Sequence, residues 1–451
     1  MSIRFRFEPS SEWFTSHSGL SVVGMLLSNT FLKQRLNGTH LPEVEVPEIS
    51  HGDVMTSYLG LLVQGKNDFD HIEPFRKDRF FQLALDVKKV PSSPTLRQRL
   101  DMAGTSKEWK RILLEESARL LKRVKAPLTP VSVKSNSDLK EYLPLDIDVS
   151  PFDNSNTKKE GVGRTYKGTD GYAPIFAYLG QEGYGVNTEL REGSHHVQKG
   201  TAIFLAESIR YAKQVSSLPL LVRMDAGNDS KENIQVCLNP ETQADFIIKR
   251  NPRKESPETW LAMAKEKGIC CEEREGKKVY LGSMWVNEKG IKTPIRWVFH
   301  VIERTMLKDG QMLLMPDIEF DLYWTSLTCP ASEVIELYRD HGTSEPFHSE
   351  IKTDMDMERL PSGKFATNDL VLHAALLAYN ILRIMGQFGL EEPDAPIRKK
   401  VTRRRIRTVI QTLLTLAARL VHHARQYILR FGRYSPWYST LKHVYTRSLA
   451  I

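Results

Sequence analysis

The stretch from Tyr338 to Lys352 places aromatic, acidic and cationic side chains within fifteen residues. If the part from Glu345 onward is helical, Glu345 and Lys352 are two turns apart and project from one face. A carboxylate and an ammonium on one stripe could hold a metal ion and a phosphate side by side. The alternative is a solvated helix with intrahelical ion pairs, so residues elsewhere in the chain must decide.

Carboxylates also end two strand-like runs. Residues 142–150 form a short apolar strand on which Asp146 and Asp148 point to the same face. Asp225 closes the continuous apolar run 218–227, which is typical of a central strand covered on both sides. An unpaired carboxylate inside a sheet is costly, so acids there commonly serve a site, although an aspartate at a strand end also starts turns.

The stretch with Glu345 resembles the DDE transposases of bacterial insertion sequences. Around their catalytic Glu, these enzymes carry a Tyr, two residues, an Arg, three residues, the Glu, six residues and a Lys. Tyr338, His341, Glu345 and Lys352 fall on this spacing. His341 stands where the family has Arg, and Arg339 is close enough to reach a phosphate in its place.

The two aspartates extend the resemblance. Asp148-Val149-Ser150 resembles the Asp-x-Thr/Ser context of the family's first catalytic acid, and Arg223-Met224-Asp225 resembles its Arg-x-Asp motif. The resemblance implies that Asp148, Asp225 and Glu345 are the catalytic acids. Asp146 is the alternative to Asp148.

Three carboxylates without a Cys or His cluster suit hard divalent cations bound through oxygen. We expect Asp148, Asp225 and Glu345 to hold two Mg²⁺ ions about 4 Å apart, which polarise a phosphodiester and activate water or a 3′-hydroxyl. Mn²⁺ can substitute. In this hypothesis Lys352, His341 and Arg339 orient phosphates and Tyr338 positions the DNA strand.

The resemblance implies an α/β fold with an RNase H-like core. The predicted order of three strands, a helix, a strand and a helix places the first and fourth strands side by side in that fold, which brings Asp148 and Asp225 together. The expected segments are a first core part at 141–250, a β-rich insertion at 251–328 and a last core part with the catalytic Glu at 329–390, including an apolar helix over 368–385 that packs on the sheet.

Residues 1–130 are predicted to form an all-helical N-terminal DNA-binding domain, followed by a polar linker at 131–144. Ser93 can cap a helix that starts at Pro94, and Arg97 and Arg99 then lie in its early turns, where a recognition helix would meet base edges. A capped surface helix with two arginines is the commoner explanation of these residues. The expected helices cover 20–31, 53–62, 73–85 and 107–124.

The positive charge is concentrated at the C-terminal end. Residues 395–451 hold thirteen Lys or Arg and no Asp or Glu, whereas the other 394 residues hold 50 basic and 55 acidic side chains. We expect a basic helical C-terminal region, with one long helix or a helix pair over 395–431. Its basic patch, Arg398 to Lys400 and Arg403, Arg404 and Arg405, is a candidate DNA contact or dimer helix, and a membrane-surface helix is the alternative.

Composition is that of a globular protein, at 41% hydrophobic and 26% charged residues. No signal peptide is expected, and the best apolar run, 370–385, is interrupted by polar residues. We therefore predict a cytoplasmic, nucleoid-associated bacterial protein without a membrane partner. Its predicted partners are double-stranded DNA, as terminal inverted repeats and target, and a second copy that pairs the two ends.

Three other functions compete with this prediction. A nuclease on the same fold would hydrolyse strands without joining them. A DNA-binding regulator derived from a transposase would carry a dead site. A glycosidase with paired carboxylates explains neither the basic C-terminal region nor Lys352.

Overall fold

The computed structural model describes residues 3–42, 44, 47–135, 138–397 and 401–450. The chain divides into two compact units, which are described separately. Unit 1 holds Met1–Ala126 and Glu350–Ile451, and unit 2 holds Pro127–Ser349. This division differs from the predicted segments, because the N-terminal and C-terminal regions share one unit and the predicted segment 329–390 is divided after Ser349.

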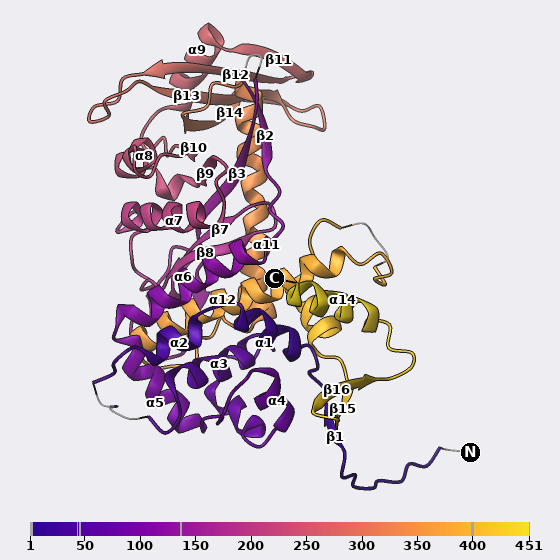
Figure 1. Cartoon of the computed structure of the whole chain (residues 1–451). Coiled ribbons are helices and arrows are strands. Elements are labelled where there is room, and N and C mark those ends of the chain that lie inside the picture. Colours follow the sequence, from indigo (N-terminus) through magenta and orange to yellow (C-terminus); the bar gives the residue numbers. More distant parts are fainter. Residues whose placement is uncertain (1–2, 43, 45–46, 136–137, 398–400, 451) are drawn as a thin grey trace. The chain divides into compact units, whose positions relative to one another are not determined.

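Unit 2 is built on one mixed sheet (Figure 1). Its central strands run in the order β8-β7-β3-β9-β10, with β3 antiparallel to β7 and parallel to β9. The strands that carry Asp148 and Asp225 are therefore neighbours, as the sequence predicted. The bounds are β3 Asp138–Val149, β7 Ile175–Leu179, β8 Tyr184–Glu189, β9 Leu220–Met224 and β10 Asp245–Lys249.

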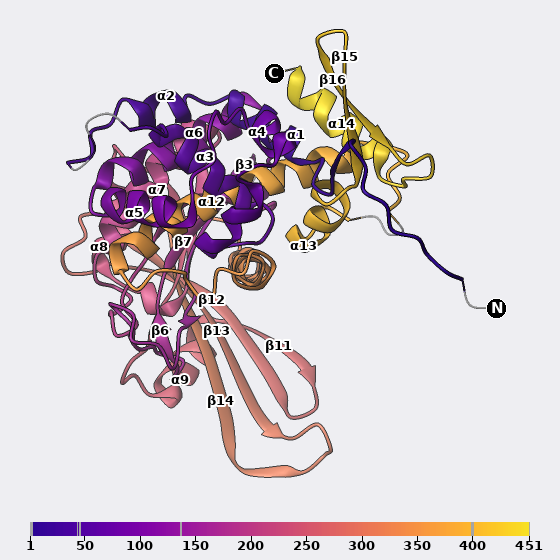
Figure 2. The ribbon, with the colours of Figure 1, turned by 90° about the horizontal axis from the view of Figure 1, so that it is seen from below.

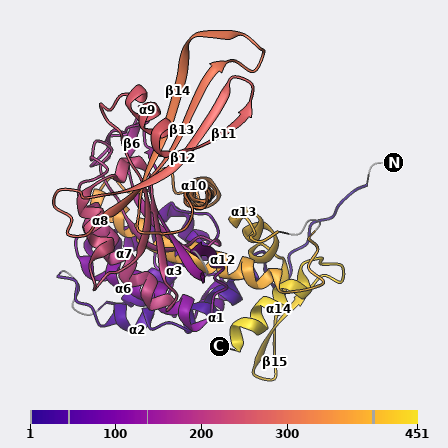
Figure 3. The ribbon, with the colours of Figure 1, turned by 90° about the horizontal axis from the view of Figure 1, so that it is seen from above.

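The strands expected in 251–328 are present, and they extend the central sheet because β14 pairs with β10. Figure 2 shows them as a group of long strands. Along these strands alternate side chains face opposite sides, so helix α9 packs on Phe299 and helix α10 packs on Val298. Figure 3 looks along α10 beside the strands. The bounds are α9 Pro257–Lys267, β11 Ile269–Arg274, β12 Lys277–Val286, β13 Ile295–Met306, β14 Met312–Thr325 and α10 Ala331–Arg339.

Two further helices follow strands of the central sheet, namely α7 (Thr201–Val215) after β8 and α8 (Lys231–Leu238) after β9. The polar segment at 131–144 is not a linker. Strand β2 (Val131–Ser135) pairs with the first part of β3, so these residues form a hairpin. A small sheet of order β4-β6-β5 lies between β3 and β7 in the chain, with bounds β4 Phe152–Asp153, β5 Gly163–Arg164 and β6 Asp170–Tyr172.

The N-terminal part of unit 1 is mainly helical, as predicted. The helix expected at 73–85 is interrupted, because a 3-10 helix ends at Phe75 and α4 starts only at Arg79. Ser92, not Ser93, caps α5, since its side chain accepts a hydrogen bond from the Thr95 amide. The bounds are α1 Leu20–Ser28, α2 Leu32–Asn37, α3 His51–Leu62, η1 Phe69–Phe75, α4 Arg79–Ala84, α5 Ser93–Gly104 and α6 Lys107–Arg123.

Helix α12 (Phe365–Leu390) is the core helix of unit 1. It packs against α3, α5 and α6, so the apolar helix predicted at 368–385 belongs with the N-terminal helices instead of the sheet. Within the described residues it is the one helix long and apolar enough to cross a membrane, and 94% of its most apolar window is buried. Its apolar surface is explained by this packing.

The prediction of one long helix or a helix pair over 395–431 is wrong. Strands β15 (Ala418–His423) and β16 (Gln426–Phe431) form a hairpin, and β15 also pairs with β1 (Trp13–Thr15). Ala424 and Arg425 both have positive φ, the geometry of a two-residue hairpin turn, which helical spacing of apolar residues did not reveal. The neighbouring elements are α13 Ile406–Val409, the π-helix η5 Ile410–Leu414 and α14 Tyr438–Leu449.

Candidate active site

Asp148 lies near the end of β3, and Asp225 directly follows β9, the neighbouring parallel strand. The register of the two strands pairs Asp146 with Arg223 and Ile147 with Met224, so Asp148 and Asp225 follow at the same end of both strands. Neighbouring strands are about 4.8 Å apart, which brings the two carboxylates together. We call Asp146 and Arg223 the inner pair, and Asp148 and Asp225 the outer pair.

The inner pair is a buried ion pair. Arg223 Nε donates to Asp146 Oδ1 at 2.6 Å, and Nη2 donates to Oδ2 at 2.7 Å. Burial alone would raise the pKa of Asp146, but the Arg223 guanidinium and His341 hold it below its ordinary value. Asp146 is thus satisfied within the fold, which leaves Asp148 as the first candidate acid.

His341 belongs to the inner pair instead of a phosphate site. Its Nδ1 lies 3.0 Å from Asp146 Oδ1, and the residue is 7% exposed. Burial disfavours its charged form, yet the hydrogen bond to Asp146 raises the pKa of His341 above its ordinary value. The expectation that His341 meets a phosphate is therefore wrong in this structure. Arg339, at the end of α10, is exposed.

Asp148 is held by two donors. The Val149 amide donates to Asp148 Oδ1 at 2.7 Å, and His348 Nε2 lies 3.1 Å from Oδ2. Burial would raise the pKa of Asp148, but the His348 hydrogen bond lowers it below its ordinary value. Asp148 is therefore ionised at neutral pH, with 23% of its side chain exposed.

Asp225 carries negative charge that the inner pair does not neutralise. Burial and the neighbouring Asp148 raise the pKa of Asp225, although Asn228 Nδ2 donates to its Oδ1 at 2.6 Å. The Asn228 amide oxygen is buried and has no hydrogen-bond partner within the described part of the chain. The outer pair thus places two carboxylates, which are both negative when ionised, near each other.

The charges of the outer pair affect the pKa values of two nearby tyrosines. Burial and the charges of Asp148 and Asp225 raise the pKa of Tyr166 to about 12, and the Tyr166 hydroxyl donates to the Val149 carbonyl at 3.2 Å. Burial and the charge of Asp225 also raise the pKa of Tyr338 well above its ordinary value. Both phenols therefore remain protonated near the two acids.

Glu345 is not joined to the outer pair. It is exposed on the six-residue helix α11 (Ser344–Ser349), and no hydrogen bond or ion pair links it to Asp148 or Asp225 within the described residues. Lys352 lies in unit 1, on the π-helix η4 (Glu350–Asp354). The structure thus brings two of the three predicted acids together.

The outer pair fits a hard cation without completing its ligand set. No group of three or more His, Cys, Asp or Glu side chains able to hold a metal occurs in the described ranges. The negative charge that raises the pKa of Asp225 is what a divalent cation bound through oxygen neutralises. Asp148 and Asp225 therefore suit Mg²⁺, with the third position left for a group outside the pair.

The two arginines predicted to read DNA from α5 differ in exposure. Arg97 is exposed and stacks over the Phe69 ring at 5.5 Å. Arg99 is buried, and its Nη1 lies 3.2 Å from the Ile49 carbonyl and 2.8 Å from His51 Nδ1. The expectation of a DNA contact is wrong for Arg99 in this structure and stays a prediction for Arg97.

The arginines of the predicted basic patch are engaged inside unit 1. Arg403 pairs with the fully buried Glu350, and Arg405 pairs with Asp354. Arg404 is buried over the Trp437 ring at 4.4 Å, and burial lowers the pKa of Arg404 to about 10. The patch is thus largely compensated by carboxylates that precede the basic region. Arg398, Lys399 and Lys400 lie outside the described residues.

Two contacts of the outer pair were not predicted from the sequence. His348 follows Glu345 by three residues and bonds Asp148, and Asn228 follows Asp225 by three residues and bonds it. In the sequence, only their position three residues after a candidate acid could have indicated either contact. Their roles depend on which side chains the fold brings together.

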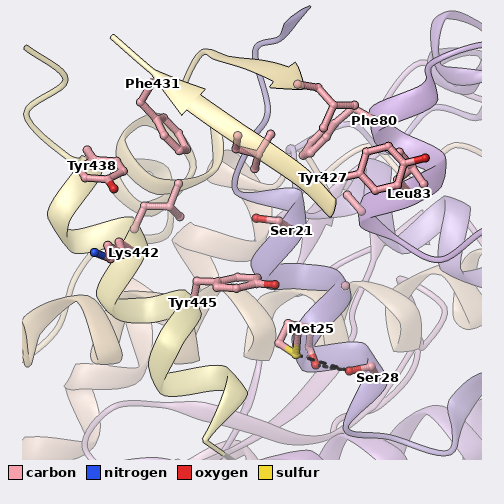
Figure 4. Close-up of a pocket in the computed structure, with 15 residues that line it drawn as sticks. Ser21, Met25, Ser28, Phe80, Leu83, Tyr427, Phe431, Tyr438, Lys442 and Tyr445 are labelled. Atoms are coloured by element: carbon pink, nitrogen blue, oxygen red, sulfur yellow. Dashed lines mark hydrogen bonds between the residues drawn. The ribbon is translucent and has the colours of Figure 1, made fainter. Parts of the chain in front are cut away.

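Unit 1 contains an apolar groove of about 520 Å³, shown in Figure 4. Met25 of α1, Phe431 of β16 and Tyr445 of α14 line it, and Lys442 is its one charged side chain in the part of the chain that the structure describes. Without a carboxylate, this groove offers no ligand for a hard cation. The candidate site for metal-dependent chemistry is therefore the outer pair.

The comparisons with known proteins point to a transposase family. The family model described as "Transposase DDE domain group 1" matches residues 3–450. Among solved structures, the chain is similar to one in the cryo-EM structure of the piggyBac transposase synaptic complex with hairpin DNA, with a TM-score of 0.40 and 12% identity over 90% of this chain and 83% of that chain. No curated protein matches the sequence.

Proposed function

Because the chain belongs to the family of transposases with a DDE domain of group 1, we propose that it moves a bacterial insertion sequence. In this proposal it binds the terminal inverted repeats, cleaves the DNA at the element ends and joins the 3′ ends to target DNA. Two copies pair the two ends in the bacterial cytoplasm, at the nucleoid.

The proposed catalytic core is RNase H-like. Its support is the strand order β8-β7-β3-β9-β10, in which the first three strands of the core are antiparallel and the next two run parallel to β3. Strands β11 to β14 are the proposed β-rich insertion. In this topology the first two acids lie at the same end of two neighbouring central strands.

The single observation that carries the proposal is the outer pair. Asp148 and Asp225 are the proposed ligands of Mg²⁺, for which Mn²⁺ can substitute, and Glu345 is the proposed third ligand. When bound, two such ions supply Lewis-acid activation of the phosphodiester and of the attacking oxygen. The protonated Tyr338 can donate a hydrogen bond to a phosphate oxygen beside the two carboxylates.

The proposed phosphate contacts are the exposed cations of the predicted motif and of α5. Arg339 and Arg97 are exposed in the structure, and Lys352 completes the motif. Such contacts give DNA affinity that falls as salt rises.

The test incubates the protein with linear DNA that bears the element's terminal repeats, with and without Mg²⁺. Cut ends and strand-transfer products support the transposase. Asp148→Ala, Asp225→Ala and Glu345→Ala are expected to abolish both while leaving the DNA mobility shift intact. Cuts without joined products identify a nuclease instead.

A second candidate is a DNA-binding regulator with a dead site. The observation that favours it is the exposed Glu345, which makes no contact with the outer pair within the described residues. A mobility shift by the wild-type protein without any Mg²⁺-dependent cutting would establish this candidate.

A further inference from the structure

His348 lies between the outer pair and strand β7. Its ring is buried, with 7% of the side chain exposed, and its Nε2 is 3.1 Å from Asp148 Oδ2. Its Nδ1 is 3.2 Å from the Tyr178 hydroxyl. The ring therefore bridges a buried phenol and a candidate metal ligand.

The chemistry of the partners fixes the direction of both hydrogen bonds. The carboxylate of Asp148 is ionised and only accepts, so His348 Nε2 carries the proton that it shares with Asp148. In the neutral ring Nδ1 then accepts, and the Tyr178 hydroxyl donates to it. Asp148 thus requires the Nε2–H tautomer of the neutral His348 ring, and the Tyr178 hydroxyl satisfies the remaining Nδ1 of this tautomer.

Aromatic packing fixes the orientation of the ring. The His348 ring centroid lies 5.4 Å from that of Phe176 and 5.2 Å from that of Tyr178. Both aromatics are on β7, where Phe176 pairs in register with Asp148. The strand beside Asp148 therefore also positions the histidine that bonds it.

The same histidine anchors the helix that carries the third proposed acid. His348 and Glu345 are both on α11, so the contact of His348 with Asp148 holds this helix at β3. We propose that His348 is a positioning residue, which orients Asp148 for metal binding and anchors α11, the helix that carries Glu345, to strand β3. This inference rests on the proposed function of Asp148, Asp225 and Glu345.

The experiment separates the hydrogen bond from the packing. His348→Phe keeps an aromatic ring between Phe176 and Tyr178 but removes the donor, whereas His348→Gln keeps an N–H at a similar place. Tyr178→Phe removes only the hydroxyl that bonds His348 Nδ1. His300→Phe, at a buried histidine of β13, is the matched control.

Mn²⁺ affinity is measured without DNA, by titration followed by electron paramagnetic resonance, and single-turnover cleavage is measured at saturating Mn²⁺. Outer-shell partners of metal ligands commonly change affinity about 10- to 100-fold. We expect His348→Phe to weaken Mn²⁺ binding by that factor and to slow cleavage further. His348→Gln should recover most of both, Tyr178→Phe should lose less than His348→Phe, and His300→Phe should bind Mn²⁺ normally.

Wild-type Mn²⁺ affinity and cleavage in His348→Phe would overturn the inference. Equal losses in His348→Gln and His348→Phe would also overturn it, because they would point to packing alone. Thermal melts identify any variant that fails to fold. If the wild-type protein binds Mn²⁺ but cuts no DNA, the proposed function fails while the affinity series still decides the role of His348.

Discussion

The inner and outer pairs each combine an aspartate of β3 with a residue near or just after the end of β9. The partner of the aspartate is a cation in the inner pair and a second carboxylate in the outer pair. Both lie where β3 and β9 run side by side, but Asp146 is paired with Arg223 whereas the charge of Asp148 acts on Asp225. The guanidinium compensates the buried carboxylate of the inner pair within the fold. In the outer pair the charge of Asp148 instead raises the pKa of Asp225, and a bound cation would compensate both carboxylates.

This difference separates an acid that holds the fold from acids that can bind a cation. Removing one partner of a buried ion pair leaves the other charge uncompensated. Removing one of two like charges relieves repulsion instead. Substitutions of Asp146 and of Asp225 should therefore have opposite effects on stability.

The largest expected effect is on catalysis by the outer pair. Asp148→Asn and Asp225→Asn should each slow Mg²⁺-dependent cleavage about a thousand-fold or more, or about 4 kcal/mol, since each removes a metal-ligand charge. Single-turnover cleavage of terminal-repeat DNA measures this. Cutting at the wild-type rate by either variant would remove that residue from the site.

The next effect is on stability through the inner pair. Asp146→Asn should destabilise unit 2 by about 3–5 kcal/mol, because it leaves the buried Arg223 without its carboxylate. Urea unfolding measures the change, and the apolar double variant Asp146→Leu with Arg223→Met should recover part of it.

The matched control for this loss is the exposed pair of Glu207 and Arg210, 3.9 Å apart with side chains 50% and 60% exposed. Glu207→Gln should change the unfolding free energy by less than about 1 kcal/mol. Equal losses in Asp146→Asn and Glu207→Gln would contradict the role of the inner pair.

A smaller effect of opposite sign is expected when repulsion in the outer pair is removed. Asp225→Asn should stabilise the metal-free protein by about 1 kcal/mol, because like charges at this separation repel by at least that amount. Thermal melts in a chelator measure the shift. A lower melting temperature than the wild type would show that the outer pair is compensated within the fold.

The smallest effect concerns pH. The folded-state pKa of His341 is raised, so its contribution to stability is full below the unfolded value of 6.5 and is lost as pH rises through the folded value. Urea midpoints should therefore fall from pH 6 to pH 9 in the wild-type protein and fall less in His341→Gln. Parallel curves for the two proteins would exclude His341 as the titrating group.

The sequence predicted the elements of unit 2 better than those of the C-terminal region. The strands that carry Asp148 and Asp225 were recognisable because each is an apolar run that ends in an acid, and their adjacency followed from the expected strand order. The β15 and β16 hairpin was not, because its apolar residues also fit a helical spacing and its turn uses Ala424 and Arg425, which rarely adopt positive φ.

Partners of charged side chains were the least predictable part of the site. Arg99, Arg403 and Arg405 look like phosphate ligands in the sequence, yet the fold gives them partners, including Glu350 and Asp354. These pairings join residues about fifty positions apart, so no local pattern encodes them. His341 and His348 show the same limit, since each bonds an aspartate on β3.

Mn²⁺ binding to the metal-free protein tests the central claim most directly. The wild-type protein and the double variant Asp146→Leu with Arg223→Met should bind Mn²⁺, because both keep the outer pair. Asp225→Asn should lose this binding although it remains folded. Equal Mn²⁺ affinity in Asp225→Asn and the wild type would contradict the assignment of the outer pair as a cation site.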